Sequence, residues 1–267
     1  MPLSLVSILF LCGTAWNVPA QETEVEAILA RLTLEQKAMQ MHLVGYAGIA
    51  LAPEMRALIA EERIGGFFLQ VPENFTFPEE CATLVNEIQS VAMDGGRGIP
   101  LFVALDGEGG VAAPIHYMLG ATPTPGNMAL GASGREADAY AAYHTLGVEM
   151  RACGVNVNFA PAIDVLTRPE NPDYTVRSFG GDMARNALLG RAAVRGLQDA
   201  GVIACAKHFP GLAYYVEDTH SAAPHVTLSD AELWEGGLGH WGAVIEAGTG
   251  MVMTGHVYID AWDPDFP

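Results

Sequence analysis

The sequence predicts an α/β fold and, within that class, a (β/α)8 barrel of the TIM type. Apolar runs typical of buried strands alternate at least five times with longer helical stretches, which indicates parallel strands joined by helical crossovers. Polar residues collect directly after these runs, where barrels and open parallel sheets both place their chemistry. Residues 107–110 (Gly-Glu-Gly-Gly) lack the third glycine of a dinucleotide fingerprint, and no phosphate-loop lysine motif is present. A barrel is therefore favoured over an open nucleotide-binding sheet.

The helices are predicted from their caps and apolar faces. Thr33 and Gln36 fit a capping box, and the helix that they begin has an apolar face that extends to Leu43. Apolar residues at helical spacing mark the others, and Ser229 is a plausible cap for the last of them. These further predicted helices are Pro53–Glu62, Pro78–Met93, Arg135–Arg151, Asp182–Ala200 and Ser229–Ala247.

The strands are predicted from short apolar runs bounded by glycine or proline. The run that ends at Ala206, for example, follows Gly201 and precedes Pro210. The predicted strands are Ile64–Leu69, Ile99–Leu105, Val155–Ala160, Val202–Ala206 and Met251–Val257.

Composition limits the classes of partner. Half of the 267 residues are hydrophobic, which is enough for a sizeable core, and 13 basic residues stand against 31 acidic ones, for a net charge of −18. Nucleic acid is not an expected partner, because phosphate binding needs a basic face. The acidity is interpreted as a solvated surface that keeps the protein soluble.

The N-terminus resembles a secretory signal peptide. Residues 3–16 are almost wholly apolar, and Val18-Pro19-Ala20 before Gln21 resembles a small-residue cleavage site. We therefore expect residues 1–20 to be a signal peptide, residues 21–267 to form one domain, and the protein to be secreted or periplasmic. The run is too short to span a bilayer comfortably, so no membrane span is expected in the mature chain. The alternative is a buried N-terminal helix in a cytoplasmic protein.

The cysteines do not suggest a disulfide framework. Cys12 would leave with the signal peptide, and Cys81, Cys153 and Cys205 are far apart and odd in number. We interpret these three as core thiols, not as a disulfide framework or a metal site.

The most informative stretch is residues 207–220. Lys207 and His208 come where a buried strand is predicted to end, and Pro210-Gly211 turns the chain into a loop. The loop carries Asp218 and His220, and residues i and i+2 of an extended segment point to the same side. Asp218 is thus placed to hold one imidazole nitrogen of His220 while the other moves a proton.

Ionisable groups of both signs follow the predicted strands. Asp106, Asp164, Arg177, Lys207 and His208 lie at strand ends or in loops. Such a set suits a neutral, hydroxyl-rich ligand, because carboxylates accept hydrogen bonds from hydroxyls and cations donate to ring or acyl oxygens. A strictly anionic ligand is disfavoured by the two aspartates.

With these motifs the sequence resembles glycoside hydrolase family 3. The matching pieces occur in the family's order: residues 99–110, 154–161 with Asp164, 177–180, 207–211, 218–220 and 253–256. The resemblance implies a (β/α)8-type barrel that removes a β-linked sugar from a non-reducing end. It also implies that configuration is retained through a glycosyl-enzyme intermediate.

The Asp-x-His element is similar to that of the family's β-N-acetylglucosaminidase branch, where an Asp-His pair replaces the usual carboxylic acid/base. The resemblance assigns His220 as acid/base and Asp218 as the residue that orients it. Asp106, Arg177, Lys207 and His208 match the positions that grip sugar hydroxyls. The implied substrate is a small carbohydrate or a peptidoglycan-derived sugar, and no cofactor is implied.

Three departures from the branch stand out. Leu212-Ala213 replace a His-Gly pair, and Val111 and Pro114 occupy places where the branch has arginines. The family's nucleophile is an aspartate on a strand beyond the region that ends at Pro267, so the barrel is expected to be incomplete at its C-terminus. Asp260, Asp263 and Asp265 precede that strand and are not credible nucleophiles, so hydrolysis by residues 1–267 alone is not predicted.

Two alternatives stay open from the sequence. The same fold serves a β-glucosidase or another β-hexosidase, since contacts beyond Asp106 have changed, or the chain is a catalytically inactive sugar-binding module. Asp164 is expected to turn its strand into the loop, Glu108 to support the site from behind, and His256 to pack at a strand end. A metal site of His208, His220 and His225 matches no familiar ligand spacing, and no metal is predicted.

Overall fold

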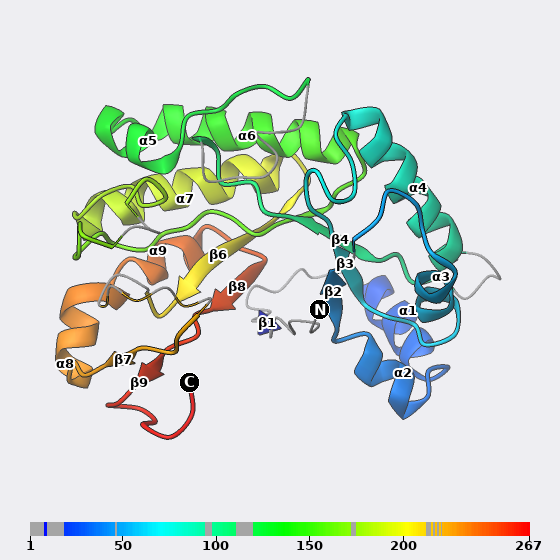
Figure 1. Cartoon of the computed structure of the whole chain (residues 1–267). Coiled ribbons are helices and arrows are strands. Elements are labelled where there is room, and N and C mark those ends of the chain that lie inside the picture. Colours follow the sequence, from blue (N-terminus) through cyan, green and yellow to red (C-terminus); the bar gives the residue numbers. More distant parts are fainter. Residues whose placement is uncertain are drawn as a thin grey trace.

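The computed structural model describes residues 8–9, 19–45, 47–93, 98–110, 120–171, 175–211, 215, 217, 219 and 221–267. Strands and helices alternate along most of this chain, as Figure 1 shows. The strands are β1 (Ile8–Leu9), β2 (Leu43–Gly45), β3 (Gly66–Phe68), β4 (Phe102–Leu105), β5 (Val157–Asn158), β6 (Ile203–Phe209), β7 (His225–Val226), β8 (Met251–Thr254) and β9 (Tyr258–Ile259). The helices are α1 (Pro19–Leu29), α2 (Leu34–Met39), α3 (Pro53–Ala60), α4 (Pro78–Met93), α5 (Asn127–Ser133), α6 (Glu136–Ala152), α7 (Met183–Asp199), α8 (Asp230–Leu233) and α9 (Trp241–Glu246).

The main sheet is half of a parallel barrel. Its order is β1-β8-β6-β5-β4-β3-β2, and every pairing from β2 to β8 is parallel. Only β1 runs antiparallel, against β8. Strands that follow one another in the sequence are neighbours in the sheet, which is how a (β/α)8 barrel winds. The predicted fold class, an incomplete barrel, is confirmed.

Both faces of the sheet are buried. One face contributes to the main core beneath the helices, and the other holds a small cluster made of Ala104, Val157, Phe159, Cys205 and Met251. Because parallel strands are covered on both sides, they appear in the sequence as continuous apolar runs and not as alternating ones. This is why the predicted strands matched real ones.

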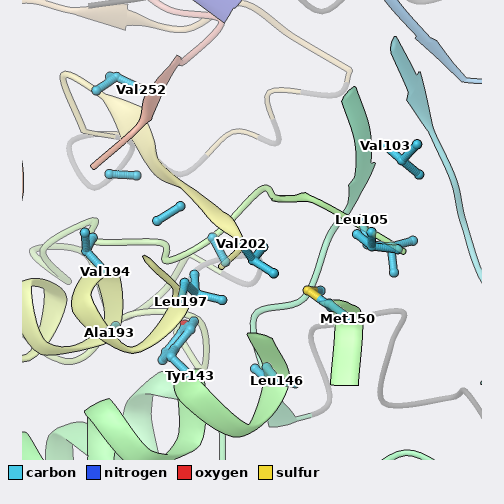
Figure 2. Close-up of a cluster of buried hydrophobic side chains, with 14 of the residues drawn as sticks. Val103, Leu105, Tyr143, Leu146, Met150, Ala193, Val194, Leu197, Val202 and Val252 are labelled. Atoms are coloured by element: carbon cyan, nitrogen blue, oxygen red, sulfur yellow. The ribbon is translucent and has the colours of Figure 1, made fainter. Parts of the chain in front are cut away.

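Close packing of α6 on α7 supports the outer face. A Cβ at Gly196 would lie 2.6 Å from the carbonyl oxygen of Tyr140, and one at Gly147 would lie 2.7 Å from Ala200 Cβ. The two glycines therefore let the helices approach more closely than larger residues would. In Figure 2, Tyr143, Leu146 and other side chains from these helices gather with residues of the strands in one buried cluster.

Several elements differ from the predictions. The helix begun at Thr33 ends at Met39, and Leu43 belongs to β2, which was not predicted. Helix α5 was also missed, and the helix expected over 229–247 is interrupted by a π-helical segment, Trp234–Leu238. Strand β6 continues to Phe209, so Lys207 and His208 are among its last three residues and do not follow it.

A second, two-stranded sheet lies beyond the ends of β6 and β8. Strand β7 pairs with β9 in parallel, with His225 opposite Tyr258 and Val226 opposite Ile259. This sheet joins the segment that follows β6 to the segment that follows β8. Figure 1 shows it beside α8, near the C-terminal end of the chain.

The structure describes only part of the N-terminal segment to which the predictions apply. The boundary expected after Ala20 falls inside α1, and Cys12 lies outside the described residues. Cys81, Cys153 and Cys205 are buried free thiols, as predicted. Among the residues that the structure describes, no helix is both long and apolar enough to cross a membrane.

Candidate active site

The candidate site begins at the C-terminal end of β4. Strand β4 leads directly into Asp106, and the next residue, Gly107, is held by the side chain of Asn158 at the end of β5. The Gly107 N–H donates to Asn158 Oδ1 at 2.8 Å, and Asn158 Nδ2 donates to the Gly107 carbonyl at 2.9 Å. Asn158 is fully buried, so this pair of bonds fixes the backbone that presents Asp106 and Glu108.

Glu108 joins two cations that are distant in the sequence. Arg177 grips it with two hydrogen bonds, from Nε to Oε2 and from Nη2 to Oε1, both 2.7 Å long. Lys207 Nζ lies 2.7 Å from Glu108 Oε1 and 2.5 Å from Asp106 Oδ1. We call Asp106, Glu108, Arg177 and Lys207 the charge network. It ties the end of β6 to the end of β4.

The charge network favours the ionised forms of Glu108 and Lys207. Burial alone would raise the pKa of Glu108, but the Lys207 ammonium and the Arg177 guanidinium outweigh it and lower this pKa from 4.5 to about 2. Burial likewise acts to lower the pKa of Lys207, yet the carboxylates of Asp106 and Glu108 raise it above its ordinary value. Each buried charge is thus stabilised by its partners, as an ion pair out of water requires.

Tyr143 and Asn127 support the network from the helix side. The Tyr143 hydroxyl contacts Asn127 Oδ1 at 2.7 Å and the Glu108 carbonyl at 3.2 Å. Asn127 Nδ2 then donates to the Arg177 carbonyl at 2.8 Å. Helices α5 and α6 therefore set the backbone on both sides of the Glu108–Arg177 pair.

His208 is held by Asp164 in a second buried pair. Nδ1 of His208 lies 2.9 Å from Asp164 Oδ2, and the Ser178 hydroxyl donates to the Asp164 carbonyl at 2.6 Å. Burial lowers the pKa of His208 even though Asp164 opposes this, so the imidazole is favoured in its neutral form. Asp164 was expected to turn its strand into the loop, and in the structure its buried carboxylate also holds the ring of His208.

The site combines buried anchors with accessible groups. The Lys207 and Glu108 side chains are each 2% exposed, whereas those of Asp106, Arg177 and His208 are 32%, 16% and 13% exposed. The accessible members thus supply a carboxylate acceptor, a guanidinium donor and a neutral imidazole within one region. Such a set can hydrogen-bond several hydroxyls of an uncharged ligand.

The structure brings together four of the six predicted site residues: Asp106, Arg177, Lys207 and His208. Asp218 and His220, the predicted acid/base pair, lie outside the described residues, as do Val111, Pro114 and the Leu212-Ala213 pair. His256 is exposed, so the prediction that it packs at the strand end is wrong. Within the described part of the chain, no group of three or more His, Cys, Asp or Glu side chains could hold a metal ion.

Comparison with known proteins decides the family. The family model described as glycosyl hydrolase family 3 N terminal domain matches residues 33–267, nearly the whole chain. The chain belongs to glycoside hydrolase family 3. The resemblance carried by the sequence motifs is thereby confirmed, and so is the barrel that it implies.

The chain is similar in sequence to relatives in this family and similar in fold to solved structures of it. The β-hexosaminidase A of Pseudoalteromonas piscicida is 37% identical over 80% of this chain and 36% of the relative. A β-N-acetylglucosaminidase/β-glucosidase of Cellulomonas fimi is 34% identical over 74% of this chain and 33% of the relative. The structure of a family 3 β-N-acetylglucosaminidase from Paenibacillus sp. str. FPU-7 superimposes with a TM-score of 0.83 at 40% identity, over 88% of this chain and 44% of the other. The chain therefore spans about a third to a half of the length of these relatives.

Some members of the site were not predicted in their present roles. Glu108 was expected to support the site from behind, but its pairing with both Arg177 and Lys207 was not predicted. Tyr143 and Asn127 were not singled out at all. Arg177 lies 69 residues from Glu108 in the sequence, and Lys207 lies 101 residues from Asp106. The spacing of the motifs in the sequence does not indicate which of these side chains pair.

Proposed function

We propose that this chain is the sugar-gripping part of a retaining glycoside hydrolase that removes β-linked N-acetylglucosamine from the non-reducing end of a small carbohydrate or peptidoglycan-derived substrate. The observation that carries the proposal is the charge network with the adjacent His208–Asp164 pair, placed at the strand ends of a family 3 barrel. Similarity to hexosaminidases supports the choice of sugar.

In this proposal each side chain has a defined role. Asp106 accepts hydrogen bonds from sugar hydroxyls, while Arg177 and His208 donate to or accept from others. The Lys207 ammonium holds the Asp106 carboxylate in place at this site. His220 protonates the glycosidic oxygen as the bond breaks and later removes a proton from water, and Asp218 orients its ring. A retaining mechanism also needs a carboxylate nucleophile, and none of the residues named above takes that role.

The location of the protein also belongs to the proposal. The apolar segment 3–16 and the Val18-Pro19-Ala20 sequence support export, so we place the mature protein outside the cytoplasmic membrane or in the periplasm. Export would bring the site to wall-derived sugars. Mass determination of the N-terminus after expression in a bacterial host tests this: a mature chain that begins at Gln21 supports export, and retention of Met1 contradicts it.

The decisive test of function compares two substrates. The whole protein, as its gene encodes it, is assayed with an aryl N-acetyl-β-glucosaminide and with the matching aryl β-glucoside. We expect a higher kcat/KM for the first. Equal or better turnover of the glucoside would instead support a β-glucosidase, an alternative favoured by the dual activity named for the Cellulomonas fimi relative. Turnover of neither would support an inactive sugar-binding module.

The acid/base assignment is tested by His220→Ala. Loss of the proton donor should lower kcat/KM by orders of magnitude for a substrate with a poor leaving group, and much less for an activated one that departs without protonation. A uniform loss for both kinds of leaving group would remove His220 from this role.

A further inference from the structure

Helix α5 lies directly against the segment that carries Arg177. A Cβ at Gly131, within α5, would overlap the carbonyl oxygen of Phe179. Only a residue without a side chain permits such a close approach, so the helix and the backbone of the Arg177 segment are in direct contact. Asn127, the first residue of α5, therefore lies where this helix meets the charge network.

The Asn127 side chain uses both ends of its amide to connect three segments. Nδ2 donates to the Arg177 carbonyl at 2.8 Å and to the Ala162 carbonyl at 3.0 Å. Oδ1 accepts a hydrogen bond of 2.7 Å from the Tyr143 hydroxyl. Asn127 is buried, and a buried amide is stable where its donors and its acceptor are paired. Here both amide protons and the amide oxygen have partners.

Tyr143 extends these contacts to the loop after β4. Its hydroxyl also lies 3.2 Å from the Glu108 carbonyl oxygen, so that one proton serves two acceptors. Burial, together with the nearby Glu108 charge, raises the pKa of Tyr143, and the hydroxyl therefore keeps its proton and remains a donor. The loop that bears Glu108 is thus connected through Tyr143 to Asn127.

The contact with Ala162 leads to Lys207. Ala162 lies opposite Lys207 in an isolated parallel bridge. The Lys207 N–H donates to the Pro161 carbonyl at 3.1 Å, and the Ile163 N–H donates to the Lys207 carbonyl at 2.8 Å. Asn127 therefore holds the stretch of backbone that pairs with Lys207.

These hydrogen bonds meet the backbone of the charge network from one side. Glu108, Arg177 and Lys207 belong to three segments, and the ion pairs between them weaken as their atoms move apart. We propose that Asn127 and Tyr143 are positioning residues, which hold these three segments at the spacing that sugar binding requires. Wherever it concerns the sugar, this role rests on the proposed function.

Tyr143→Phe is the milder test, because it removes the hydroxyl and keeps the ring. Its matched control is Thr249→Val. The Thr249 hydroxyl also serves two backbone acceptors, the Ala204 carbonyl at 3.1 Å and the Met251 carbonyl at 3.0 Å. It lies before β8, at the end of the sheet opposite the charge network.

Asn127→Ala is the stronger test, because it removes all three hydrogen bonds of the amide. Asn156→Ala is its control. The Asn156 amide likewise joins backbone groups of two segments: Oδ1 accepts from the Val103 N–H at 2.8 Å, and Nδ2 donates to the Leu101 carbonyl at 3.0 Å. These bonds lie near the N-terminal ends of β4 and β5, away from the charge network.

The first readout is the urea midpoint of the 267-residue chain as a function of pH. A displaced network would lower the pKa of Glu108 less, so a variant would have less stability to lose in acid. We expect the gap between the wild-type midpoint and that of Tyr143→Phe or Asn127→Ala to narrow by roughly a third between pH 5 and pH 2.5. The gaps of Thr249→Val and Asn156→Ala should stay constant. A constant gap for Tyr143→Phe and Asn127→Ala as well would mean that the two residues only stabilise the core, and would overturn the proposal.

The second readout is calorimetric binding of N-acetylglucosamine to the same chain at pH 7. We expect the affinity to fall about three- to tenfold in Tyr143→Phe, to fall further in Asn127→Ala, and to change less than about twofold in the two controls. A wild type that binds the sugar and variants that bind it equally well would overturn the positioning role. A wild type that does not bind it would contradict the proposed function, and the acid dependence would still decide whether Asn127 and Tyr143 position the charges.

Discussion

The protein contains two ion-pair arrangements at the same end of its sheet, and they differ in burial. The charge network of Asp106, Glu108, Arg177 and Lys207 has its central carboxylate and ammonium almost fully buried. The second arrangement, which we call the exposed pair, joins His225 to Asp260 near the surface. Both join segments that follow different strands, yet water screens the second pair much more than it screens the buried Glu108–Lys207 pair of the first.

This difference separates two ways of building a site. A buried network must be complete, because removing one partner leaves an uncompensated charge away from water. An exposed pair costs little to lose and affects mainly the local path of the chain. The charge network is therefore expected to set the stability of the proposed sugar-binding groups, whereas loss of the exposed His225–Asp260 pair is expected to have almost no effect on folding.

The largest effect is expected from Glu108→Gln. The amide keeps the shape but loses the charge that both cations share, so the free energy of unfolding should fall by about 3–5 kcal/mol. Glu87→Gln is the control, because it breaks the exposed Arg56–Glu87 pair, and should cost less than about 1 kcal/mol. Urea denaturation of both variants measures the difference. Equal losses would mean that burial does not distinguish the two kinds of pair.

Acid should reveal the same network in the wild type. Because the pKa of Glu108 is lowered from 4.5 to about 2 on folding, its stabilisation is complete above about pH 4.5 and is lost as the pH falls toward 2. The shift corresponds to a loss on the order of 3 kcal/mol. Glu108→Gln should flatten this part of the stability curve. A variant curve parallel to the wild type between pH 5 and pH 2 would contradict the assignment.

A smaller effect on ligand binding is expected from Asp106→Asn. A hydrogen bond to a charged group is worth about 1.5–3 kcal/mol, so affinity for N-acetylglucosamine should fall roughly 10- to 100-fold. Stability should change less than in Glu108→Gln, since Asp106 is partly exposed and Lys207 keeps Glu108 as a partner. Asp263→Asn, an exposed carboxylate after β9, is the calorimetric control.

His208 should add a separate window of pH dependence. Its pKa is lowered from 6.5 on folding, chiefly by burial, so its contribution to stability is complete above about pH 6.5 and declines as the pH falls below that value. His208→Asn should remove the decline that begins near pH 6.5 and keep the one that begins near pH 4.5. Persistence of both in the variant would exclude His208 as the source.

The smallest effect on stability is expected from Asp260→Asn in the exposed pair of His225 and Asp260. The exposed pair should contribute less than about 1 kcal/mol to the free energy of unfolding, measured by urea denaturation. A loss as large as that of Glu108→Gln would show that the exposed pair is as important for folding as the charge network, and the contrast between the two regions would disappear.

The sequence predicted the barrel strands better than the elements around them. Strands β4, β6 and β8 lie in continuous apolar runs because the sheet is buried on both faces. Strand β2 has three residues and follows α2 after a gap too short to break the helical pattern. Helix α5 has no side-chain cap and is rich in small residues. For both β2 and α5, the local sequence pattern was too weak to predict the element.

The site was predictable in its motifs but not in its pairings. Asp106, Lys207 and His208 stand beside strand ends, where parallel folds concentrate function. That Glu108 unites Arg177 and Lys207, or that Asp164 holds His208, depends on contacts between strands that only the folded sheet brings together. Spacing along one chain cannot encode which side chains meet across such distances.

One measurement tests the central claim most directly: a crystal structure of the protein with N-acetylglucosamine bound. The account predicts sugar hydroxyls within hydrogen-bonding distance of Asp106, Arg177 and His208, with the Glu108–Lys207 pair intact beneath them. A sugar bound elsewhere on the molecule, with solvent alone over Asp106 and His208, would contradict it.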